Sequence, residues 1–164
     1  MSGMIRNLFT LLWAIFRGAV DPASRVAAHF WITPFDAGIQ VLKSDKYLQL
    51  AEAAQLDYLI RTRLMGTLLS RRLSFVNASQ LVKFARPIPM FRRVRVETAI
   101  VFADAKCAYF SHTLFLGGQQ HAEVLVKMKF KKGSLTVPPG EVIAQRFTVK
   151  PPHLEAWDRA LDAM

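Results

Sequence analysis

The spacing of apolar residues changes along this chain, from helical spacing in its first part to alternation in its second. Between Ser44 and about Met65, apolar side chains recur every three or four positions, which gives a helix one apolar face. That face is made of Tyr47, Leu50, Ala51, Ala54 and Tyr58. The pattern predicts a long helix with Ser44 as its N-cap and Asp45 in its first turn, ending near Gly66.

Four later segments alternate apolar and polar side chains, which is typical of strands buried on one face. These segments are residues 74–85, 93–102, 107–116 and 121–131. The joins between them are short, and short joins between consecutive strands indicate antiparallel hairpins. In the second segment, one face is predicted to hold Val94, Val96, Thr98, Ile100 and Phe102. A further strand is predicted over residues 24–32, before a loop that contains Pro34.

The amphipathic helix and the half-buried sheet must cover one another. The sequence therefore predicts an α+β fold in which an antiparallel sheet curls around a long central helix. A length of 164 residues is typical of one domain. We expect an N-terminal apolar helix over 1–20, the sheet-and-helix domain over 21–145, and a C-terminal extension over 146–164. A short helix in this extension is predicted to hold Leu154, Trp157 and Leu161 on one face.

The N-terminal helix leaves two interpretations open. Ten uncharged residues separate Arg6 from Arg17, whereas a membrane span needs about 20 apolar residues. Five apolar residues in this stretch share helical spacing: Leu8, Leu11, Leu12, Ile15 and Phe16. Such a helix, flanked by basic residues, either lies in a membrane interface or packs on the domain or on a second copy of the chain.

Composition excludes several classes of protein. Apolar residues make up 52% of the chain and charged residues 21%, which excludes intrinsic disorder. The single cysteine, Cys107, excludes a disulfide framework and a cysteine-based zinc site. His112 and His121 flank one predicted turn, but no third ligand follows at a suitable spacing, so no metal site is predicted.

The net charge of +10 favours anionic partners, such as nucleic acid, anionic lipid headgroups and the phosphates of coenzyme A. Aromatic residues are sparse between the basic ones, which disfavours nucleic acid. Charge alone does not choose between the phosphates of coenzyme A and an anionic membrane surface reached through residues 1–18. We expect a cytoplasmic protein, either free or peripheral on a membrane; the single thiol fits a reducing compartment.

Short motifs in a fixed order carry a resemblance to a known family. Asp36, Ala37 and Gly38 form an Asp-Ala-Gly loop, and Tyr47 and Glu52, five positions apart, follow on the predicted helix. This order resembles the 4-hydroxybenzoyl-CoA thioesterase-like family of the hotdog-fold acyl-CoA thioesterases. The resemblance implies the hotdog fold, in which an antiparallel sheet wraps a long helix.

Later residues extend the resemblance to about 25–143. Residues 84–88 resemble a family strand that ends in Arg-Pro. The hairpin at 104–106, with Tyr109 and His112, resembles a branch that includes small membrane-associated thioesterase-like proteins. Two features depart from the family pattern. The spacing from the loop aspartate to the helix tyrosine is 11, one more than usual, and Lys-Ser-Asp-Lys replaces a His-x-Asn segment.

The resemblance implies hydrolysis of an acyl-CoA or acyl-carrier thioester, without a cofactor, in a homodimer or higher homo-oligomer. The resemblance also implies that Asp36 is the nucleophile or the general base, and that backbone amides at the start of the helix donate hydrogen bonds to the oxyanion. Asp45 and Glu52 are further catalytic candidates. The candidates for substrate binding are Gly38, Ile39, Ser44, Tyr47 and Arg86.

Each catalytic candidate also has a structural interpretation. Asp36 is a typical turn residue, Asp45 suits the start of a helix, and Glu52 suits a polar contact on a helix surface. The departures from the family pattern leave a second function open. In that alternative, a hotdog protein peripheral to the membrane binds acyl groups or lipids without cleaving them.

Overall fold

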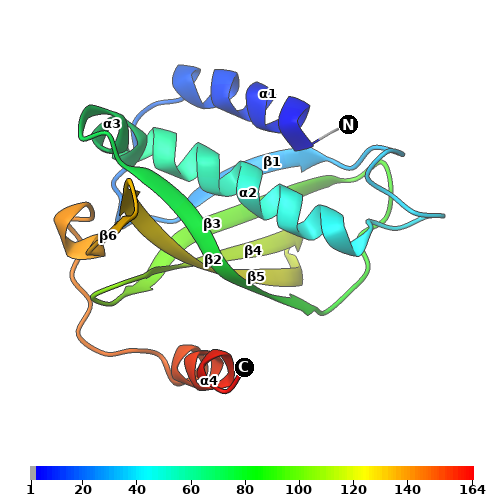
Figure 1. The fold of residues 1–164 in the computed structure, drawn as a ribbon. Helices are drawn as coiled ribbons and strands as arrows, with labels where there is room; N and C mark the ends of the chain where they lie inside the picture. The colour runs from blue at the N-terminus through cyan, green and yellow to red at the C-terminus, as the bar shows by residue number, and fades with distance from the viewer. Residues whose placement is uncertain (1–2) are drawn as a thin grey trace.

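An antiparallel sheet curls around the long helix α2 in the computed structural model, which describes residues 3–164 (Figure 1). The strands are β1 (Val26–Trp31), β2 (Ser74–Phe84), β3 (Arg93–Ala103), β4 (Ala108–Leu116), β5 (Gln119–Lys132) and β6 (Leu135–Val137). The helices are α1 (Gly3–Phe16), α2 (Ser44–Arg61), α3 (Leu64–Ser70) and α4 (Pro152–Asp162), with a 3-10 helix η1 at Pro139–Glu141. The strand order is β1-β3-β4-β5-β2, and β6 pairs with β5. The predicted sheet around a central helix is confirmed; β6 was not predicted, and residues 1–2 of the expected N-terminal helix lie outside the described residues.

The core lies between the inner face of the sheet and α2. Leu50, Ala51 and Tyr58 of α2 are buried against Val94 and Val96 of β3 and their neighbours. Burial of each large apolar side chain contributes roughly 1.5–3 kcal/mol to stability. The alanine on the helix face keeps that face thin, so the curled sheet can approach the helix closely.

A bulge in β3 changes which face Phe102 occupies. The pairing of β3 with β4 shifts register between Ile100 and Phe102. One extra residue reverses the alternation of side chains beyond it. Phe102 therefore packs with Tyr109 on the outer face of the sheet, and Ala103 packs on the inner core. The prediction that Phe102 shares a face with Val94 is wrong for this reason.

The central helix ends earlier than predicted. The chain turns sharply at Arg63, which has a φ of 63°, and a second helix, α3, begins at Leu64. The hydroxyl of Thr62 donates to the Tyr58 carbonyl at 2.7 Å and satisfies one of the last acceptors of α2. The turn lets Leu64 and Leu68 reach the core. Gly66 consequently lies inside α3 and does not end the central helix.

Helix α1 lies alongside α2 (Figure 1). Arg6 and Ala14 are buried, whereas Leu8, Leu12 and Phe16 are exposed. The predicted helix is confirmed, but most of its apolar stripe does not cover the domain. None of the helices in residues 3–164 combines the length and the apolar character needed to cross a membrane.

Helix α4 covers the outer face of the sheet, on the side opposite α2 (Figure 1). Leu154 and Trp157 are buried there, and the Trp157 ring meets the Tyr109 ring edge to face at 6.3 Å. The predicted apolar face of this helix is confirmed. A polar cluster adjoins it: the carboxylate of Asp158 accepts from Tyr109 Oη at 2.7 Å, from Lys127 Nζ at 2.9 Å, and from Lys150 Nζ.

Asp158→Asn should weaken the attachment of α4 to the sheet. Burial raises the pKa of Asp158, but hydrogen bonds from Lys150, Lys127 and Tyr109 outweigh it and lower the pKa to about 2. The carboxylate therefore stabilises the fold above pH ~4, and this contribution is lost as the pH falls through about 2. Because the side chain is partly exposed, we expect a loss of about 1–2 kcal/mol at pH 7.

Urea unfolding at pH 7 and at low pH measures this contribution. The difference between the wild-type protein and Asp158→Asn should shrink at low pH. The control is Asp162→Asn, an exposed position on the same helix, which should change stability little at either pH. Equal stability of the wild-type protein and Asp158→Asn at pH 7 would show that the cluster does not hold α4.

Candidate functional site

Two loops meet at the N-terminus of α2 and form a cleft with the end of β2. The Leu42 amide donates to the Ile88 carbonyl at 2.8 Å, and the Met90 amide donates to the Gln40 carbonyl at 3.1 Å, so the loops hold each other. The cleft has a volume of about 280 Å³. Its lining consists of Val41, Leu42, Ser44, Tyr47, Phe84, Ala85, Arg86 and Pro87. Three of the predicted substrate-binding residues, Ser44, Tyr47 and Arg86, are therefore brought together.

The first turn of α2 starts at this cleft without a side-chain cap. The N-cap is Lys43, in an extended conformation with no capping hydrogen bond from its side chain, and not the predicted Ser44. The Lys43 amide donates to the Asp36 carbonyl at 3.0 Å. This hydrogen bond fixes the position of Lys43, the residue before the predicted cap Ser44. The positive end of the helix dipole thus lies beside Ser44, where it favours negative charge.

Tyr47 and Phe84 form the apolar wall of the cleft. Their rings meet edge to face with centroids 4.9 Å apart. Burial raises the pKa of the Tyr47 hydroxyl, so this side chain is neutral at physiological pH. Arg86 lies at the margin, exposed, and donates to Gln119 Oε1 at 2.9 Å. The cleft therefore combines an apolar wall, a helix N-terminus and one accessible cation.

Asp36 is not among the residues that line the cleft, and its side chain contacts Arg6 of α1. Its side chain is 0% exposed. The Thr33 amide donates to Oδ2 of Asp36 at 3.0 Å, and the Thr33 hydroxyl donates to the same oxygen at 2.7 Å. Arg6 of α1 forms a buried ion pair with the other carboxylate oxygen. Both oxygens of the carboxylate are thus engaged within the chain.

These contacts keep Asp36 ionised. Burial raises the pKa of the Asp36 carboxyl, but the hydrogen bonds from Thr33 and the ion pair with Arg6 outweigh it. The pKa therefore lies below its usual value. A carboxylate is the form that both a nucleophile and a general base require.

The remaining predicted site residues lie outside the lining of the cleft. Asp45 is in the first turn of α2 with its side chain 62% exposed, 3.7 Å from Lys46 Nζ. Glu52 is exposed in the middle of α2. Gly38 closes the loop through its amide, which donates to the Val41 carbonyl at 2.8 Å. Ile39, at the tip of that loop, is 93% exposed.

No sequence pattern indicates that Arg6 contacts the candidate catalytic residue. Arg6 precedes Asp36 by 30 positions, and in the sequence it is only a basic residue beside an apolar stretch. Its second terminal nitrogen, Nη1, is buried without a hydrogen-bond partner among the described residues. One signal was readable in the sequence: Thr33 stands three positions before Asp36, a spacing typical of local turns closed by side chains.

Comparison with solved structures relates the fold to thioesterases. A probable thioesterase from Bartonella henselae is 17% identical and aligns over 76% of this chain and 100% of its own, with a TM-score of 0.59. A DHNA-CoA thioesterase from Staphylococcus aureus is 12% identical and aligns over 84% of this chain and 91% of its own, with a TM-score of 0.63. At such identities the likeness shows the fold, which is the hotdog fold.

Comparison of sequences assigns the family. No curated protein shows significant sequence similarity to the chain. The profile of the thioesterase-like superfamily matches residues 36–156, which is most of the chain. The matched region begins at Asp36 and includes α2, the cleft and strands β2 to β6, whereas α1 and β1 precede it. The chain therefore belongs to the thioesterase-like superfamily.

Proposed function

We propose that this protein hydrolyses the thioester of an acyl-CoA or an acyl carrier in the cleft at the N-terminus of α2. The observation that carries the proposal is the uncapped first turn of α2, which starts at a cleft in a member of the thioesterase-like superfamily. Tyr47 and Phe84 would contact the acyl group, and Arg86 would contact a phosphate of the carrier.

The helix start suits the charge that develops during the reaction. Attack on a thioester carbonyl places negative charge on its oxygen, and backbone amides at a helix N-terminus stabilise such an oxyanion. In our proposal these amides belong to residues 44–45. Asp36 acts either as a nucleophile or as a general base that takes a proton from water. In the second case the hydroxide attacks the carbonyl carbon, the C–S bond breaks, and the thiolate leaves and takes up a proton.

Asp36 can perform this step only if Arg6 moves aside. The carboxylate is fully buried, and its two oxygens are engaged by Thr33 and Arg6. Thr33 is held on the same loop and can stay in place to orient the carboxylate. Arg6 belongs to α1, so a shift of this helix frees the oxygen that Arg6 occupies.

We also propose that the protein forms a homodimer through β2. This strand has 11 residues and lies at one end of the strand order, where Val76, Leu81 and Phe84 are exposed. Long edge strands with exposed apolar residues pair readily with another chain. Since Phe84 also lines the cleft, a second copy paired along β2 would lie next to the candidate site.

A second candidate function is the binding of acyl groups without hydrolysis. The engagement of Asp36 by Arg6 and Thr33 favours it, because a carboxylate held in this way serves to position the loop. Lys43 and Lys46 also stand where the related family carries its His-Asn segment. This candidate predicts acyl-CoA binding with no release of thiol.

Asp36→Asn should abolish hydrolysis if Asp36 is the catalytic carboxylate. We expect kcat to fall by about 10²-fold or more, the usual contribution of a general base. The assay is thiol release from acyl-CoA esters of graded chain length. Asp162→Asn is the matched control, because Asp162 is exposed on α4, across the sheet from the cleft, and it should stay near the wild-type rate.

The outcomes separate the two candidates. Circular dichroism must first show that Asp36→Asn is folded, because the change leaves Arg6 buried without its anion. Thr33→Val, which removes one hydrogen bond to the carboxylate, provides a milder second variant. Full activity of Asp36→Asn would reject Asp36 as the catalytic group. Tight binding of acyl-CoA by a wild-type protein that releases no thiol would favour the binding function.

Arg6→Gln tests whether α1 restrains the carboxylate. We expect kcat/KM to rise on the order of tenfold, since more molecules would have Asp36 free at any moment. The pKa of Asp36 should rise because the Arg6 cation no longer favours ionisation. The acid limb of the pH–rate profile should therefore move to higher pH. Arg25→Gln, at an exposed position after α1, serves as the control. A lower rate with an unchanged pH profile would contradict this role of Arg6.

A further inference from the structure

Helix α1 presents its polar side to the domain and its apolar side to the exterior. Arg6 and Ala14 are buried, and Thr10 is partly buried. The exposed apolar residues are Met4, Ile5, Leu8, Phe9, Leu12, Trp13, Ile15 and Phe16. An apolar helix face usually turns toward the core of its own domain. The arrangement seen here leaves a contiguous apolar surface, which marks an interaction site.

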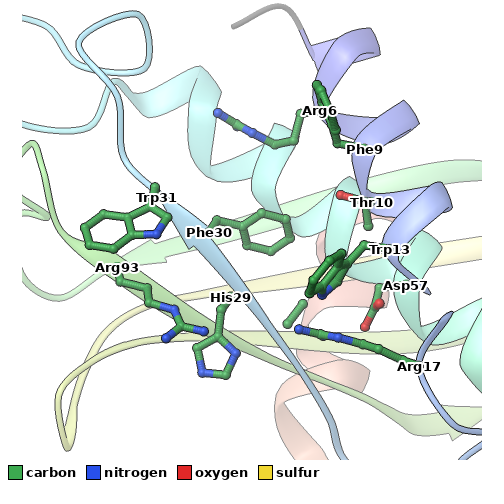
Figure 2. A pocket seen from close by; sticks show the side chains of 11 residues that line it. Arg6, Phe9, Thr10, Trp13, Arg17, His29, Phe30, Trp31, Asp57 and Arg93 are labelled. Atoms are coloured by element: carbon green, nitrogen blue, oxygen red, sulfur yellow. The ribbon is translucent and has the colours of Figure 1, made fainter. Parts of the chain in front are cut away.

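A cationic groove runs beside this apolar face, between α1 and the edge strand β1 (Figure 2). It has a volume of about 430 Å³. Trp13 of α1 and Trp31 of β1 flank it, and the side chains of Arg17 and Arg93 lie on either side of His29 (Figure 2). Burial and then the charges of Arg93, Arg17 and Arg95 lower the pKa of His29, as expected where positive charge is concentrated.

Negative charge is scarce around this surface. The sequence holds no acidic residue before Asp21. Asp57 lines the groove, but it is buried, and its carboxylate lies 3.4 Å from Arg61 Nη1. The groove therefore combines exposed tryptophans with an excess of positive charge: Arg6, Arg17 and Arg93 line it against the Asp57 carboxylate, which interacts with both Arg61 and Arg17. Tryptophan and arginine next to an apolar helix face are typical of protein surfaces at a membrane–water interface.

The charges distinguish a lipid surface from a second copy of the chain. Each chain carries a net charge of +10, so a second copy would bring further positive charge to the arginines of the groove. Anionic headgroups would instead pair with them. A helix of 14 residues is about 21 Å long and can lie in the interface plane while its buried side stays on the domain.

We propose that α1 and the groove beside it dock on the surface of an anionic lipid bilayer. The outward apolar residues of α1 enter the boundary between headgroups and acyl chains. The phosphates of the headgroups contact Arg17 and Arg93. The match to the superfamily profile begins at Asp36, after α1 and β1, so the profile itself does not describe this surface.

Flotation of the full chain with lipid vesicles tests the proposal without any acyl-CoA present. We expect binding to vesicles of phosphatidylglycerol mixed with phosphatidylcholine, and weaker binding to pure phosphatidylcholine. The double variant Leu8→Gln/Leu12→Gln should bind the mixed vesicles at least about tenfold more weakly, because two apolar side chains no longer enter the bilayer. Leu69→Gln is the matched control, since Leu69 is 70% exposed and belongs to α3 rather than to α1.

A second pair of variants tests the charged groove. Arg17→Gln/Arg93→Gln should reduce the preference for phosphatidylglycerol over phosphatidylcholine, and added salt should do the same to the wild-type protein. If the wild-type protein fails to float, or the α1 variant floats as well as Leu69→Gln, the proposal is wrong. Sedimentation gives a further outcome. If Leu8→Gln/Leu12→Gln converts a dimer to a monomer and leaves flotation unchanged, the face is an interface between copies and the lipid proposal is overturned.

Discussion

The fold depends on the burial of α2 from two sides. The curled sheet covers Leu50, Ala51 and Tyr58, while Asp57 is buried as well and lines the groove beside α1. A helix enclosed in this way needs no strong amphipathic pattern. Its enclosure fixes the position of its first turn, and the loops that hydrogen-bond to each other there form the cleft. Both the core and the candidate site thus follow from the packing around one helix.

Local patterns carried most of the fold prediction. Alternation and helical spacing are repeated over many residues, so single exceptions did not change the assignment of an element. The errors arose where one residue decides the outcome. The bulge after Ile100 reversed the face of Phe102, the turn at Arg63 ended α2 before Gly66, and the extended Lys43 displaced Ser44 as the cap. The bulge, the turn and the shifted cap cannot be detected from the periodicity of apolar residues along the chain.

The candidate site was only partly readable from sequence. Ser44, Tyr47 and Arg86 were grouped through the family resemblance, and they line one cleft. The direction of the Asp36 side chain could not be predicted, because it depends on Arg6, a partner 30 positions away on a separate helix. The orientation of α1 was missed for a related reason. The spacing of apolar residues identifies the apolar face of a helix, but it does not indicate whether the domain or another surface covers that face.

The ion pair between Arg6 and Asp36 makes α1 and the carboxylate thermodynamically linked. Arg6 lowers the affinity of Asp36 for a proton. By reciprocity, a proton on Asp36 makes the packing of α1 on the domain less stable. Any ligand or surface that draws α1 away must raise the proton affinity of the carboxylate by the same free energy. The docking of α1 and the protonation of Asp36 are therefore coupled equilibria, although the helix and the loop lie far apart in the chain.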